Sequence, residues 1–169
     1  LLYNSVMATP SDQLAEIVAK LQGGDEDQKI AAVKQMIDMV SDEDAPIDDR
    51  LIDSGVIPPL VACLGSENVQ LRVEAAGAVV EMAQRSRELQ HALVRAGALQ
   101  LLYDMIKSNF DGELDNTLLA LSCLIETDEE RQIVLGLGAL ALMPRLLSHE
   151  DPGIRECARL VQSKITSSG

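Results

Sequence analysis

The chain has 169 residues and a formal net charge of −13, with 14 Lys and Arg against 27 Asp and Glu. Proteins that bind a phosphate backbone carry basic faces, so this charge argues against a direct nucleic-acid partner. Hydrophobic residues make up 47% of the chain but aromatic residues only 2%, which favours aliphatic helices over aromatic-rich strands. The length is typical of one domain, and we expect an all-α fold.

The first residues carry no fold signal. Met7 opens the run Met-Ala-Thr-Pro-Ser, which is typical of a natural start, so we interpret residues 1–6 as an engineered or fused peptide. We take residues 1–11 as an N-terminal extension and residues 12–169 as the folded domain. No apolar run approaches the roughly 20 residues that cross a bilayer, so we expect no membrane partner.

The chain then repeats one pattern. A short helical segment ends at a glycine, an apolar helix follows, and a polar break leads to a longer amphipathic helix; the glycines Gly55, Gly97 and Gly138 lie 42 and 41 residues apart. No single unit could bury its apolar stripe alone, so the pattern predicts a right-handed α-solenoid of about four stacked repeats. We expect positive φ at these glycines, where a helix ends and the chain turns sharply. The approximate repeats are 12–46, 47–88, 89–130 and 131–169, and the first copy lacks its short helix.

Three segments carry a family resemblance: Ile52–Leu64, Val94–Ile106 and Leu135–Leu147. Their period and three-helix unit resemble the armadillo repeat, and residues 45–61 with 69–83 resemble early repeats of the importin-alpha family. The resemblance implies a protein-binding module that holds an extended basic peptide in a groove formed by the third helix of each repeat. Residues 135–147 also resemble short armadillo-like exchange factors of Hsp70, which is the alternative function, and a partnerless or engineered scaffold is another.

In the importin-alpha family, each third helix presents a Trp and, four positions later, an Asn to the groove. Neighbouring indole rings flank the stems of Lys or Arg, and the Asn amide binds the peptide backbone. The matching Trp positions here are Met36, Gly77, Leu119 and Leu160, and the Asn positions are Val40, Glu81, Cys123 and Lys164. None of them is Trp or Asn, so we carry over the fold and the interaction role but not the binding of nuclear-import cargo.

Helical spacing nevertheless groups candidate groove residues on one face of two third helices. They are Gln70, Glu74, Gly77 and Glu81 in the second repeat and Asn116, Leu119 and Cys123 in the third. Residues 1–84 hold 15 acidic and 5 basic side chains, a net charge of −10, so we expect a protein or peptide partner with basic character. A glycine inside a helix lowers its stability, and either a pocket or tight helix packing would explain Gly77.

The chain lacks the patterns of catalytic and metal sites. His91 and His149 stand far apart, and Gly136 with Gly138 makes only half of a dinucleotide-binding motif. Three cysteines without a paired spacing suit a reducing cytoplasmic or nuclear location; we expect Cys63 in the core and Cys123 on the groove line. The sequence predicts no enzyme, no metal and no cofactor.

Overall fold

The structure, a computed structural model, describes residues 8–42, 44–108 and 111–167. The expected peptide at residues 1–6 lies outside this part of the chain. Within the described residues the secondary structure is helical throughout, as predicted, and no strand is present. The elements are α1 (Pro10–Gly23), α2 (Glu26–Ser41), α3 (Asp48–Asp53), α4 (Ile57–Cys63), α5 (Val69–Arg85), α6 (Arg87–Arg95), α7 (Ala98–Ser108), the 3-10 turn η1 (Asp111–Glu113), α8 (Leu114–Leu124), α9 (Asp128–Leu137), α10 (Ala139–Leu147) and α11 (Pro152–Thr166).

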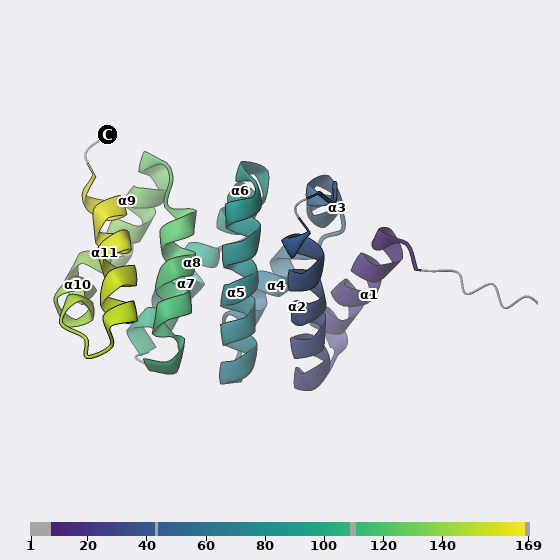
Figure 1. Ribbon diagram of the computed structural model, residues 1–169, viewed down its shortest axis with the longest axis horizontal. Helices are drawn as coiled ribbons and strands as arrows, with labels where there is room; N and C mark the ends of the chain where they lie inside the picture. The colour runs from purple at the N-terminus through teal and green to yellow at the C-terminus, as the bar shows by residue number, and fades with distance from the viewer. Residues whose placement is uncertain (1–7, 43, 109–110, 168–169) are drawn as a thin grey trace, which may run out of the picture.

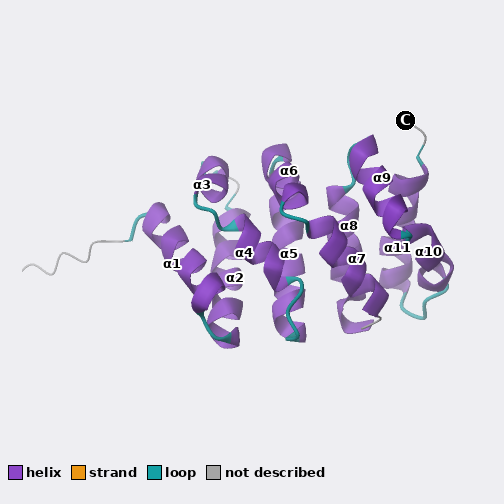
Figure 2. Ribbon diagram, turned by 180° about the vertical axis from the view of Figure 1, so that it is seen from behind, coloured by secondary structure: helices purple, strands orange, loops and turns teal. Residues whose placement is uncertain are grey.

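These helices form an α-solenoid of four stacked units, which confirms the predicted fold. The last three units each contain three helices (α3–α5, α6–α8 and α9–α11), whereas the first contains only α1 and α2, as the truncated first copy predicted. The third helices α2, α5, α8 and α11 pack against one another in chain order. Figure 1 shows this order along the length of the molecule, and Figure 2 shows the second helices α4, α7 and α10 on the opposite side.

Local signals set where the helices begin and turn. Gly55, Gly97 and Gly138 have φ of 74°, 92° and 98°, which confirms the expected left-handed turn between the first and second helix of each complete unit. Pro58 and Pro59 lie in the first turn of α4, where a missing N–H leaves no helical bond unmade. Side-chain caps begin most of the longer helices; they come from Thr9, Asp25, Asn68, Ser86, Thr127 and Asp151.

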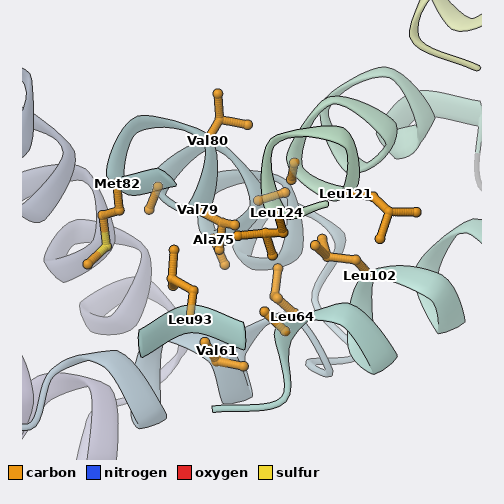
Figure 3. Close-up of a cluster of buried hydrophobic side chains, with 14 of the residues drawn as sticks. Val61, Leu64, Ala75, Val79, Val80, Met82, Leu93, Leu102, Leu121 and Leu124 are labelled. Atoms are coloured by element: carbon orange, nitrogen blue, oxygen red, sulfur yellow. The ribbon is translucent and has the colours of Figure 1, made fainter. Parts of the chain in front are cut away.

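The core is continuous from one unit to the next. Between the second and third units it is built from Val61 of α4, Leu64 directly after α4, Leu93 of α6 and Leu102 of α7, which meet the buried faces of α5 and α8 (Figure 3). Each of these four side chains is buried, and aliphatic residues dominate the core throughout. Apolar burial between neighbouring units therefore supplies the main stabilisation, as expected for stacked repeats.

Two arginines add polar ties between units. Arg72 of α5 donates from Nε to Glu113 Oε2 at 2.8 Å and from Nη1 to the Ser66 carbonyl at 2.7 Å. A second bond joins the Arg72 guanidinium to Glu113 Oε1, and the two side chains are only 10% and 4% exposed. This buried pair links the second unit to the third.

Arg85, at the end of α5, ties the second unit back to the first. Its guanidinium donates to the carbonyl oxygens of Val40 and Asp42, at 2.8 and 2.7 Å, and to that of Ala45. It also binds the carboxylate of Asp48 at 2.5 Å. One side chain thus donates hydrogen bonds to carbonyl oxygens at the C-terminal end of α2 and in the following loop, which accept no hydrogen bond within a helix.

Candidate groove on the third helices

One row of exposed or half-buried residues runs along each third helix; we call these rows together the third-helix face. In α5 the row consists of Gln70 and Glu81, which are exposed, with Glu74 and Gly77 between them, which are half-buried. Most of the rest of α5 is covered by the core. The helical spacing of the sequence therefore brought these four candidates to one face.

The row in α8 holds the other three candidates. Asn116, Leu119 and Cys123 are half-buried, and Leu119 and Cys123 pack against the edge of the core. Gln84 of α5 contacts Cys123 Sγ at 3.8 Å, so the two rows lie side by side. All seven sequence candidates share the third-helix face.

The first unit requires a correction. The matching Trp and Asn positions on Met36 and Val40 are wrong, because these side chains are 0% and 3% exposed and belong to the core. Aligning the N-cap residues Asp25 and Asn68 shifts the correspondence by two residues, to Lys34 and Asp38, which are both exposed. The first copy has no glycine turn to anchor the alignment, so the sequence offered no marker for this register.

Charges on the third-helix face are only partly neutralised. Lys34 of α2 lies 3.3 Å from Glu74 of α5, and Lys164 of α11 pairs with Glu126. Within the described residues, Asp38 and Glu81 make no ion pair, and they occupy equivalent positions on adjacent third helices. The face is therefore acidic and incompletely paired between α2 and α5.

A cavity of about 390 Å³ opens beside Glu81. It is lined by Val40, Ser41, Asp48, Glu81, Gln84 and Arg85. Burial alone would raise the pKa of Asp48, but hydrogen bonds from Arg85 and Ser86 and the Arg85 charge outweigh it and hold that pKa below its ordinary value. Asp48 is therefore an anion paired with Arg85, whereas Glu81, which also lines the cavity, makes no ion pair with any residue that the structure describes.

Gly77 lies bare on the third-helix face. A Cβ built on Gly77 would meet no atom within 4 Å, although the residue lies in the middle of α5. Tight packing, one of the two explanations the sequence left open, therefore does not account for this glycine.

The cysteines are protonated at neutral pH, and one histidine takes part in a turn. Burial raises the pKa of the Cys63 and Cys123 thiols, which therefore stay protonated at neutral pH, and Cys63 lies in the core as expected. His149 accepts a hydrogen bond from the Asp151 amide, a turn contact. No group of three or more potential metal ligands occurs among residues 8–42, 44–108 and 111–167, and no helix there is long and apolar enough to cross a membrane.

Comparison with known proteins agrees with this architecture. The family model described as Armadillo/beta-catenin-like repeat matches residues 44–84, the second of the stacked units. The second unit matches an armadillo repeat, and the stacked units share the armadillo-repeat architecture. The repeats are similar in sequence to importin subunit alpha-3 of Caenorhabditis elegans, at 42% identity over 78 residues, covering 46% of this chain and 15% of that protein. Importin subunit alpha-2 of Arabidopsis thaliana is 28% identical over 149 residues, or 86% of this chain and 28% of its own length.

Solved armadillo-repeat structures share the fold. A designed armadillo repeat protein in complex with the peptide (KR)4 has a TM-score of 0.79 and 22% identity, covering 90% of this chain and 64% of that chain. An engineered protein has a TM-score of 0.82 and 25% identity, covering 92% of this chain and 64% of its own. The chain thus spans less than a third of the curated relatives' length and about two thirds of these engineered structures.

Proposed function

We propose that this armadillo-repeat protein is a non-enzymatic interaction module that binds an extended segment of another protein along a concave groove formed by its third helices. The observation that carries the proposal is the third-helix face, where α5 and α8 present seven polar, small and apolar residues in adjacent rows. Solenoids of this kind use such an extended face for binding. The peptide complex of the designed armadillo protein supports the same mode.

The partner we propose is basic in part. Asp38 and Glu81 lack ion-pair partners among the described residues, and the chain carries a net charge of −13. Such a field attracts a cationic segment and repels nucleic acid. The similarity to importin alpha subunits also supports a place of action in the cytoplasm or the nucleus.

The test is a selection of random 12-residue peptides displayed on phage against the wild-type protein. Selected peptides are then measured against Glu81→Lys, on the third-helix face, and Glu150→Lys, which changes net charge equally in the turn before α11. We expect Glu81→Lys to weaken binding at least tenfold and Glu150→Lys to change it less than twofold. An equal loss of affinity in both variants, or a selection that yields no binding peptide, would contradict peptide binding in the groove.

A further inference from the structure

The third-helix face has open space at Gly77, which no side chain of the described residues fills. Glycine weakens a helix interior, and here no neighbouring atom prevents a side chain from being present. Gly77 lies in α5, which packs between α2 and α8 (Figure 1). The vacancy is therefore on the face that we propose as the groove.

The equivalent positions on the neighbouring helices are filled. They are Lys34 of α2, Leu119 of α8 and Leu160 of α11, the last of which is 42% exposed. Across the molecule, these equivalent positions hold the aliphatic stem of a lysine in α2, no side chain in α5, and a leucine in each of α8 and α11. A bulky apolar side chain in the gap would be flanked by apolar atoms on both sides, which favours its removal from water.

Carboxylates lie one helical turn from the gap on either side. Glu74 is already paired with Lys34, whereas Glu81 has no ion-pair partner among the described residues and opens onto the 390 Å³ cavity. A cationic side chain next to the apolar one would pair with Glu81. Charge complementarity therefore points to a ligand with two chemistries side by side.

We propose that the bound segment places a bulky apolar residue, aromatic or leucine, above Gly77 and a basic residue against Glu81. This inference rests on the proposed function and names the ligand class of the same groove. The arrangement exchanges the roles seen in the family resemblance, because the ligand supplies the large apolar group and the receptor supplies the gap.

Three synthetic peptides test the inference by fluorescence anisotropy. The first contains two copies of Ser-Phe-Ser-Lys, which places Phe and Lys on the same side of an extended chain. The second has Ala and the third has Lys in place of each Phe. We expect the Phe peptide to bind at least tenfold more tightly than either of the others.

The matched variants are Gly77→Leu and Gly136→Leu. Gly136 also lies in a helix, α9, and a Cβ there meets no atom within 4 Å, but it is away from the third-helix face. We expect Gly77→Leu to reduce the preference for the Phe peptide to less than twofold and Gly136→Leu to retain it, with circular dichroism verifying that both variants fold.

The outcomes separate this inference from the proposed function. If all three peptides bind with equal affinity and Glu81→Lys abolishes that binding, the proposed apolar site above Gly77 is wrong, but binding in the groove is supported. A preference for the Lys peptide, or a preference for the Phe peptide that Gly77→Leu retains, would also contradict an apolar site above Gly77. Failure of all three peptides to saturate the wild-type protein would overturn both proposals.

Discussion

At the scale of single residues, the turn glycines show how a local constraint acts on the whole repeat. Gly55 has a φ of 74° in the connection between α3 and α4, a conformation that side chains with a Cβ adopt only at a cost. No atom lies within 4 Å of a Cβ built there, so the restriction comes from the backbone and not from crowding.

We expect Gly55→Val to lower the free energy of unfolding by about 1–2 kcal/mol, because a β-branched residue is strained in the left-handed region. Urea denaturation measures the change. Gly136→Ala is the control: it lies in α9 without a positive φ and has room for a Cβ, so its stability should stay equal or rise. An unchanged midpoint for Gly55→Val would contradict the strain.

Asp48 and Arg85 make a residue-scale contact that depends on pH. The pKa of Asp48 is lowered in the folded protein, so its contribution to stability is complete above the unfolded pKa of about 4 and is lost as pH falls through the lower folded value. Asp48→Asn should therefore destabilise the protein at pH 7, by about 1 kcal/mol for a partly exposed pair.

Chemical denaturation of wild type and Asp48→Asn between pH 7 and pH 2.5 measures this difference. The gap between the two proteins should be constant above about pH 5 and shrink below about pH 4, since protonation removes the wild-type advantage. A gap that stays constant down to the lowest pH would show that the carboxylate charge is not what Arg85 requires.

At the scale of elements, the Arg72–Glu113 pair joins α5 to η1, the turn that precedes α8. Both side chains are almost fully buried, so removing one partner leaves an uncompensated charge in the interface. The pair fixes the position of one unit relative to the next, whereas the apolar core supplies most of the stabilisation.

We expect Arg72→Met to lower the free energy of unfolding by about 3–5 kcal/mol, because Glu113 loses its partner inside the interface. The double variant Arg72→Met with Glu113→Leu should recover most of that loss, since neither charge then remains buried. A double-mutant cycle in guanidinium chloride measures the coupling. Simple additivity of the two single losses would contradict a direct buried pair.

At the scale of the whole molecule, charge and stacking act together. The first half of the chain carries a net charge of −10 and includes two of the four third helices, so the field of the third-helix face is strongest at its N-terminal part. Attraction through such a field is long-ranged at low salt and is screened within about 8 Å at physiological ionic strength.

A peptide of four Lys-Arg repeats should bind with a Kd above about 1 μM at 0.15 M salt, because the chain contains no Trp to flank its basic side chains. Its association should slow as salt rises, and Glu81→Lys should slow it more than Glu150→Lys. Biosensor kinetics at two salt concentrations measure these rates. Submicromolar binding would mean that acidic residues alone hold a basic peptide, and salt independence would contradict steering.

The sequence by itself determined the architecture of this protein. The turns and helices follow from local signals, each of which acts on only a few neighbouring residues. These signals are the turn glycines Gly55, Gly97 and Gly138, the prolines at the start of α4 and the 3.6-residue apolar period. The same periodicity placed Glu74, Gly77 and Glu81 on one exposed face of α5.

Only the tertiary structure decided features that depend on contacts between units. Arg72 and Glu113 are 41 residues apart and have no local pattern that pairs them. The register of α2, where Lys34 and Asp38 take the positions expected for Met36 and Val40, emerged from which face α5 and α1 bury. The open space at Gly77 also depends on tertiary structure. From the sequence, a helical glycine is compatible with either a tight contact or open space, and only the positions of the neighbouring helices distinguish the two.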